Sequence, residues 1–194
     1  WYYGQLRQGL TNEVRFMPRD AAGNAALHGT VDVAQTGRAL RQLAQGTTGL
    51  WFVDVDARTY DPALDTERLL AKNWFEASSQ QFVFDRLEYF GTAAPGPSRA
   101  RSDVAGDVRL LRAALPPGPV AAGRSLDVSL VWEALKDAPA GFKQSLRLVD
   151  SAGRLAAQED VAPGGGFVDW SRWRIGADLT ANLGLIVPVG TIPG

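Results

Sequence analysis

The chain has 194 residues, of which 45% are hydrophobic and 21% charged, a composition typical of a globular protein with a buried core. Its 20 basic and 21 acidic residues give a net charge of -1, so there is no general positive field to hold a nucleic acid. The lack of cysteine excludes disulfides and thiolate metal sites, and a single histidine, His28, excludes zinc sites built from several histidines.

The first elements predict an α/β segment. Tyr3, Leu6 and Leu10 have the spacing of one apolar helix face, which predicts a short helix at the start. Residues 33–45 predict a second helix that stops at a glycine, Gly46. The helix leads into residues 50–55, a nearly continuous apolar run that is typical of a strand buried on both faces of a parallel sheet.

Another helix and strand complete the predicted segment. Thr66 suits the N-cap of a helix over residues 67–78. The buried stripe of this helix is expected at Leu69, Leu70, Trp74 and Ala77. Residues 81–90 then predict a strand.

The sequence pattern changes after a stretch rich in glycine, proline, alanine and serine. We interpret residues 93–106 as a linker between an α/β segment at 1–92 and a second domain at 107–194. In the second domain, apolar side chains from Leu126 to Trp132 alternate with mostly polar ones, which indicates a half-buried strand with Trp132 in the core. Further strands are predicted at 107–115, 144–149, 154–160 and 178–187.

Short strands joined by turns favour an antiparallel β-sandwich of the jelly-roll type. The fold class predicted for the whole chain is therefore α+β: a small α/β segment followed by this sandwich. The predicted strands are fewer than the roughly seven or eight that close such a fold, so we expect the sandwich to be incomplete at its C-terminal end.

Seven stretches of the chain follow a pattern found in one protein family. They are GLWFVD (49–54), YDP (60–62), FDRLEYF (84–90), LVWEA (130–134), KQSLRLVD (143–150), GRLAAQED (153–160) and WSRWRIG (170–176). Together they resemble the C-terminal soluble region of large bacterial membrane glycosyltransferases, relatives of the dolichyl-phosphate-mannose protein mannosyltransferases. The similarity covers roughly residues 35–194.

The resemblance implies a non-catalytic domain on the extracytoplasmic face of a bacterial membrane, with a glycan or a polyprenyl-linked sugar nearby. Membrane contact would come through the rest of the parent chain. In such proteins the catalytic acidic residues are expected near the first membrane helices, so no catalytic residue is assigned here. The sequence begins at Trp1 without methionine, and we expect both of its ends to be cut from a longer protein.

Three carboxylates form a candidate metal site. Asp54 and Asp56 follow the apolar strand and, two residues apart, point to the same side, where Asp61 could join them. Such a trio suits Mg²⁺ or Mn²⁺ and motivates one alternative function, a metal-dependent transferase that uses Asp54 and Asp56. The competing interpretation is that these carboxylates cap turns at the strand end.

A second alternative is a carbohydrate-binding module. Trp170 and Trp173, flanked by Asp169 and Arg172, have the composition of a site where sugar rings stack on exposed aromatic rings. The competing interpretation is core packing, because each such ring can bury roughly 150–250 Å².

Overall fold

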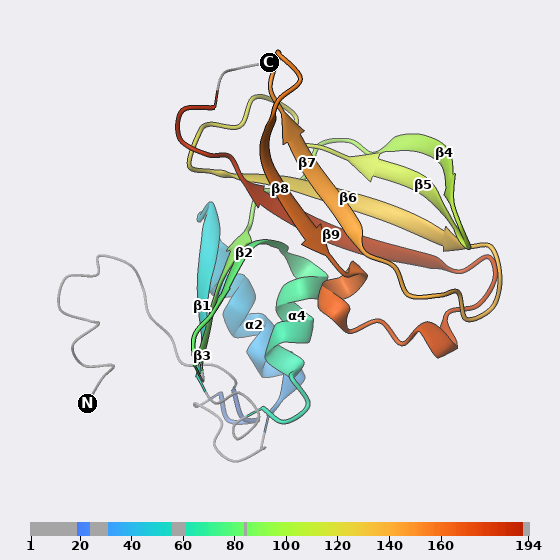
Figure 1. Ribbon diagram of the computed structural model, residues 1–194. Helices are drawn as coiled ribbons and strands as arrows, with labels where there is room; N and C mark the ends of the chain where they lie inside the picture. Colours follow the sequence, from blue (N-terminus) through green and yellow to red (C-terminus); the bar gives the residue numbers. More distant parts are fainter. Residues whose placement is uncertain (1–18, 24–30, 56–60, 84, 192–194) are drawn as a thin grey trace.

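The computed structural model of the chain describes residues 19–23, 31–55, 61–83 and 85–191 (Figure 1). The short helix predicted at the start of the chain lies outside these ranges. Over the described residues, the chain forms two α-helices and nine strands, and the strands make three open antiparallel sheets of three, four and two strands. The predicted α+β class, with a mostly β, sandwich-like second part, is therefore confirmed.

The first segment is a three-stranded sheet with two helices on one of its faces (Figure 1). Asp32 Oδ1 accepts a hydrogen bond from the Gln35 N–H at 2.8 Å and begins the first helix. This helix ends before Gly46, whose φ of 71° suits the glycine stop predicted there. The elements are α2 (Val33–Ala44), β1 (Gly49–Val55), α4 (Asp65–Asn73), β2 (Phe75–Gln81) and β3 (Asp85–Gly91), with the strand order β1-β3-β2.

Only one face of this sheet is covered by the helices. The core between helices and sheet consists of Leu40, Leu70, Trp74 and Phe90, with Leu50 and Phe52 of β1 packed against it. On the other face of β1, Trp51 is 63% exposed and Val53 is 53% exposed. The prediction of a parallel strand buried on both faces is therefore wrong, because β1 pairs antiparallel with β3 and its outer face is open.

The second helix is shorter than predicted. It begins at Asp65, where the cap is made by Asp61 rather than by Thr66, and it ends at Asn73. Ala77 then lies in β2, and a turn separates β2 from β3 where a single strand was expected. The pattern misled because Ala77 is three residues from Trp74, as in a helix, and two residues from buried Phe75, as in a strand.

Neither described helix, at 12 and 9 residues, has the length and apolar character needed to span a bilayer.

The second part is a four-stranded sheet crossed by a two-stranded hairpin (Figure 1). The sheet order is β4-β5-β6-β9 and the hairpin is β7-β8. Strand β4 lies inside the stretch predicted as a linker, and the other five strands fall where the sequence predicts them. The bounds are β4 (Arg99–Ala105), β5 (Val108–Ala114), β6 (Ser125–Ala134), β7 (Gln144–Val149), β8 (Leu155–Val161) and β9 (Asp178–Ile186).

The hairpin packs on one face of β6 and β9. Trp132 lies in this layer, as predicted, and its indole Nε1 donates a hydrogen bond to Gln144 Oε1 at 2.7 Å, which ties β6 to β7. A polar tip that meets a partner is what a half-buried tryptophan requires. The apolar members of the layer are Val161, Ala181 and Leu183, with Leu130, Trp132 and Leu146 packed against them.

The opposite face of β6 and β9 meets the first segment, and we call this contact the inter-segment seam. A Cβ at Gly184 of β9 would lie 2.6 Å from the Ala77 Cβ of β2, so the two strands pack at glycine distance. Asn182 Nδ2 also donates to the Lys72 carbonyl at 3.1 Å. Asp127 of β6, expected on a solvent face, is only 1% exposed because Gly91 of β3 lies directly on it.

Candidate functional site

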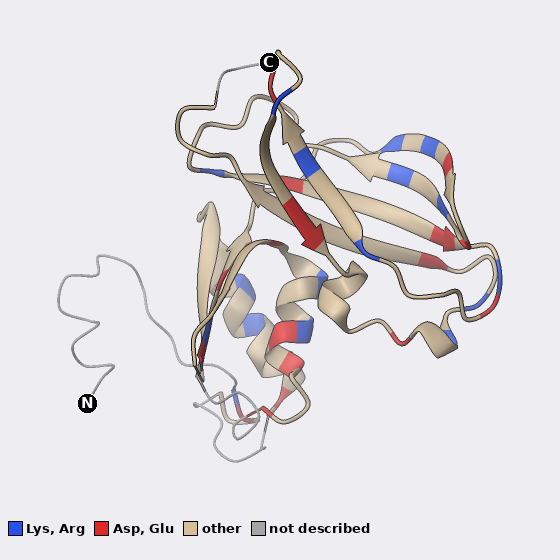
Figure 2. Cartoon of the chain, in the orientation of Figure 1, with Lys and Arg blue, Asp and Glu red and all other residues tan. Residues whose placement is uncertain are grey.

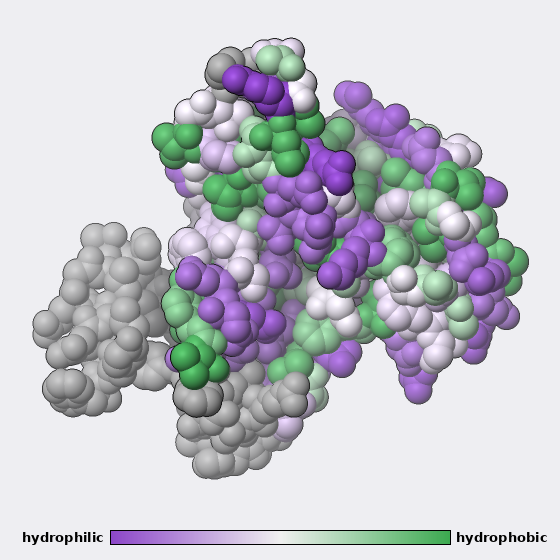
Figure 3. Space-filling view, viewed as in Figure 1, coloured by the Kyte–Doolittle hydropathy of each residue, from purple (hydrophilic) through white to green (hydrophobic). Residues whose placement is uncertain are grey.

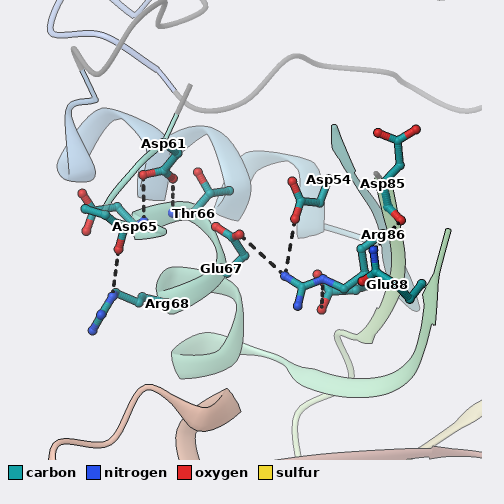
Figure 4. A network of polar contacts seen from close by, with 11 residues as sticks. Asp54, Asp61, Asp65, Thr66, Glu67, Arg68, Asp85, Arg86 and Glu88 are labelled. Carbon is teal, nitrogen blue, oxygen red and sulfur yellow. Dashed lines mark hydrogen bonds and ion pairs between the residues drawn. The ribbon is translucent and has the colours of Figure 1, made fainter. Parts of the chain in front are cut away.

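A charged cluster is buried between α4 and the sheet of the first segment (Figure 4). It consists of Asp54 on β1, Glu67 on α4, and Arg86 and Glu88 on β3, and we call it the Arg86 cluster. The guanidinium is 3.5 Å from Asp54 Oδ2, 3.6 Å from Glu67 Oε1 and 3.3 Å from Glu88 Oε1. Three carboxylates therefore share one positive charge.

Burial controls the protonation of this cluster. Glu67 is 3% exposed and Glu88 is 4% exposed. Burial raises the pKa of Glu67 to about 7, and the negative charge of Asp54 adds to the rise. Burial likewise raises the pKa of Glu88 to about 7, against the opposing effect of Arg86. Each carboxyl is therefore protonated in roughly half of the molecules at pH 7, which reduces the excess negative charge inside the segment.

The predicted metal ligands are not brought together in the described structure. Asp54 belongs to the Arg86 cluster, whereas Asp61 is 3% exposed and caps α4. Asp56 lies outside the described residues. Within the part of the chain that the structure describes, no group of three His, Cys, Asp or Glu side chains is arranged to hold a metal ion. Asp61 fits the competing interpretation, a capping carboxylate, whereas Asp54 forms an ion pair instead.

We expect Asp61→Ala to lower the free energy of unfolding by about 1–2 kcal/mol. The Asp61 carboxylate accepts hydrogen bonds from the Asp65 N–H at 2.9 Å and the Thr66 N–H at 2.8 Å, and alanine leaves both donors unpaired. Urea denaturation followed by circular dichroism measures the change. Asp61→Asn keeps one acceptor oxygen and is expected to lose less than half as much; equal losses for the two variants would contradict a capping role.

The residues predicted to bind sugar form a packed aromatic layer instead. Trp173 is 7% exposed, and its Nε1 donates to the Ala177 carbonyl at 2.9 Å. Trp170 is half-buried, with its ring centroid 5.8 Å from that of Trp173 and 5.5 Å from that of Phe142. These rings pack with Val108 and Ala134 in the sandwich core, so core packing describes Trp173.

The polar neighbours of those tryptophans bond to one another. Asp169 accepts from the Ser171 hydroxyl at 2.6 Å, and its Oδ2 lies 3.1 Å from Arg172 Nε. These hydrogen bonds lower the pKa of Asp169. The side chain begins a short 3-10 helix over Trp170–Arg172, which makes it a local cap. Asp169, Arg172 and the two tryptophans thus lie close together, and of the two rings that of Trp173 is buried.

An aromatic pair that the sequence analysis did not single out lies on the open face of the first segment. Trp51 stands opposite Tyr89 in the β1–β3 register, and the ring centroids are 4.9 Å apart at 56°. The Tyr89 hydroxyl donates to the Thr48 carbonyl at 3.3 Å. A Cβ at Gly49 would overlap the Tyr89 ring, so this ring lies over the glycine backbone. We call these two side chains the Trp51–Tyr89 platform.

Polar side chains and the exposed Val53 lie beside the platform. The strand register places Ser78 beside Tyr89, and Gln80 on the same face two residues further along β2. The Thr92 hydroxyl donates to the Thr47 carbonyl at 2.6 Å, and the two threonine hydroxyls are 3.4 Å apart. The sequence does not predict the platform, because neither strand alone indicates that Trp51 lies opposite Tyr89.

In the part of the chain that the structure describes, basic residues of the four-stranded sheet pair with carboxylates. Figure 2 shows arginines on β4 and β5 near the free edge of the four-stranded sheet. Arg109 is 3.5 Å from Glu133, and Arg112 is 3.4 Å from Asp178. On the face drawn in Figure 3, apolar and hydrophilic groups are interspersed. Pairing of this kind leaves little attraction for a polyanion.

Comparisons with protein-family models, with curated proteins and with solved structures find no match to this chain.

Proposed function

We propose that the chain is a non-catalytic extracytoplasmic domain of a membrane glycosyltransferase-like protein, and that it helps to position a glycan or an acceptor. The Trp51–Tyr89 platform is the observation that carries the binding part of this proposal. Its tryptophan is 63% exposed although it belongs to a sheet whose other face packs against two helices. A large aromatic side chain left at the surface and held by a neighbouring ring is a preferred element of recognition sites.

The chemistry of the platform suits a sugar ring. The axial C–H bonds of a pyranose form an apolar face that packs on an aromatic ring, while its hydroxyls need hydrogen-bonding partners at the edge. Ser78 and Gln80 on β2 lie on the same face as Tyr89 and supply such partners beside the rings. An open face with partners at its rim is also what weak binding of a long glycan requires.

The family resemblance supports the same location. Two of the stretches that carry it, residues 49–54 and 84–90, hold Gly49, Trp51 and Tyr89. These two stretches lie in β1 and around β3, which pair directly. The residues of the platform therefore belong to the part of the chain that carries the resemblance.

The other two functions considered for the chain receive less support. A transferase centred on Asp54 would need a carboxylate free to bind a metal, whereas Asp54 lies 3.5 Å from the guanidinium of Arg86. A carbohydrate module on Trp170 and Trp173 would need open rings, whereas Trp173 is buried.

We expect Trp51→Ala to weaken glycan binding by at least about tenfold, because it removes the ring face on which the sugar packs. Binding is measured by following the ¹⁵N–¹H spectrum of the full chain during titration with soluble oligosaccharides of several sugar types. Ile175→Ala is the matched control: Ile175 is 64% exposed and lies on the second part of the chain. Equal binding by wild-type and Trp51→Ala chains would remove the platform from the proposal.

The parent protein is tested separately. The gene that encodes this chain is expected to encode several membrane helices upstream of the codon for Trp1. A gene without membrane helices would overturn the placement in a membrane glycosyltransferase-like protein, even if the isolated chain binds a glycan.

A further inference from the structure

A positive charge stands at one end of the Trp51–Tyr89 platform. Arg124, just before β6, reaches across to the first segment, where its Nη1 donates to the Thr48 Oγ1 at 2.7 Å. The carbonyl of the same threonine accepts the hydrogen bond from the Tyr89 hydroxyl at 3.3 Å. Thr48 therefore connects the guanidinium to the ring, and both lie at the Gly49 end of the platform.

The backbone of Arg124 is fixed, so the position of its side chain is not arbitrary. Its N–H donates to the Ala121 carbonyl at 3.1 Å, and its carbonyl accepts from the Val187 N–H at 2.9 Å. The second of these bonds continues the pairing of β6 with β9 beyond the end of the strands. A fixed backbone and one side-chain hydrogen bond hold the guanidinium at the platform while it remains exposed to solvent.

The guanidinium keeps hydrogen-bond donors available. Its single described side-chain bond uses Nη1, and an arginine side chain carries five N–H donors in a planar fork. Arg124 forms no ion pair within the described part of the chain, unlike Arg109 and Arg112 on the same sheet. A fork of this kind matches the two oxygens of a carboxylate or phosphate.

A buried acidic group, Asp127, lies near the ring of Tyr89. Asp127 acts on Tyr89 together with Arg124: burial raises the pKa of Tyr89, Asp127 adds to the rise and Arg124 opposes it. Asp127, however, is 1% exposed under Gly91, and it already accepts from the Ser125 hydroxyl and, at 3.2 Å, from the Ala93 N–H. A ligand on the platform meets the exposed cation and not this carboxylate.

We infer that the Trp51–Tyr89 platform selects a sugar that carries a negative charge, with the ring stacked on the aromatic pair and the anionic group bound by Arg124. This inference rests on the proposed glycan-binding function and narrows it to acidic sugars. Two sources share the required chemistry, a carboxylate on a uronic acid and a phosphate on a sugar phosphate. Both place two oxygens at the rim of a pyranose ring, where the fork can reach them.

The test compares a neutral sugar with two sugars that carry an anionic group. The full chain is titrated with methyl glucoside, methyl glucuronide and glucose 1-phosphate, and with inorganic phosphate alone, in low salt. We expect at least one charged sugar to bind about tenfold more tightly than methyl glucoside, since hydrogen bonds to a charged group are the stronger ones. Its advantage should shrink in 0.5 M salt, since exposed charges are screened. The charged sugar that binds more tightly identifies the source.

Two variants separate the charge from the ring. Arg124→Gln is expected to bind all three sugars with the affinity that the wild-type chain has for methyl glucoside, and Arg124→Lys to keep part of the preference. Arg174→Gln is the matched control, because Arg174 is also an exposed arginine with one hydrogen bond, to the Ser171 carbonyl at 2.9 Å. Trp51→Ala should lose all three sugars.

Each other outcome has a definite meaning. Equal affinity for neutral and charged sugars, lost in Trp51→Ala, would overturn the preference for charge and leave the proposed function standing. A preference that survives in Arg124→Gln would remove Arg124 from the site. Inorganic phosphate that binds as tightly as glucose 1-phosphate, also in Trp51→Ala, would indicate an anion site rather than a sugar site. Binding of no sugar by the wild-type chain would overturn both proposals for the platform.

Discussion

Gly184→Ala is expected to lower the free energy of unfolding by about 2–3 kcal/mol. The added methyl group would lie 2.6 Å from the Ala77 Cβ and 2.8 Å from the Phe75 carbonyl oxygen, both of which belong to the neighbouring segment. Because one obstacle is backbone, relief requires the two segments to separate at the inter-segment seam. Urea denaturation followed by tryptophan fluorescence measures the loss.

Two further variants establish that the loss comes from the seam. Gly118→Ala is the matched control, since nothing lies within 4 Å of its added Cβ, and it should change stability by less than about 0.5 kcal/mol. Ala77→Gly in the Gly184→Ala background removes the nearest atom and should recover part of the loss, which a double-mutant cycle reports as coupling. A Gly184→Ala chain as stable as Gly118→Ala would contradict close packing at this position.

The stability of the chain should fall as the pH rises from 5 to 8. The pKa of both Glu67 and Glu88 is raised by burial from the ordinary 4.5 to about 7, so the folded chain binds more protons than the unfolded chain between these values. The contribution is fully present below pH 4.5 and is lost as the pH approaches and passes 7. Burial raises the pKa of Asp127 from 3.8 to about 6, so this carboxyl also stabilises the fold at low pH. Its contribution is lost as the pH rises through 6.

We expect the decrease between pH 5 and 8 to be at least about 2–3 kcal/mol, which is the contribution of one glutamate at about 1.4 kcal/mol for each pKa unit. Urea denaturation at several pH values measures it. Glu88→Gln should flatten the profile and be more stable than the wild-type chain at pH 8. Glu133→Gln, which removes a surface carboxylate paired with Arg109, serves as the control and should keep the wild-type slope. A wild-type chain with equal stability at pH 5 and 8 would show that the Arg86 cluster does not hold extra protons.

Strand periodicity was sufficient to predict most of the second part. In β6, Val128 is buried and Leu130 packs under the β7-β8 hairpin, as the alternation predicts. The glycine turn before Arg154 joins the two strands of that hairpin, also as predicted. The same alternation failed at Asp127, because burial there comes from Gly91 in another segment. The periodicity of apolar residues predicts which side chains share a face of a strand, but not which other segment covers that face.

The first part was harder to predict, because short apolar runs do not specify their partners. The run around Trp51 and Val53 reads equally well as a buried parallel strand and as an antiparallel strand with an open face. Only the pairing with Tyr89 distinguishes the two, and the helical spacing of Ala77 concealed the strand β2 that completes the sheet. The candidate platform depends on this pairing, so the sequence alone could not locate it.

The predicted sugar and metal residues were chosen for their chemical type, and the structure shows why type was not enough. Trp173 has the composition around it that a sugar site requires, yet its ring fills the core of the sandwich. Asp54 and Asp61 are close in sequence, yet one pairs with a guanidinium and the other caps a helix. In each case the deciding fact was the direction of the side chain, which depends on long-range packing.

The packing of β9 against β2 also constrains the order in which the chain can fold. Asn182 bonds to the Lys72 carbonyl across 110 residues of sequence, and Gly184 closes over Ala77 at a similar separation. Contacts this distant form late, because a long loop must close before they are made. During synthesis, the surface of β2 that meets β9 therefore stays unprotected until β9 has emerged from the ribosome.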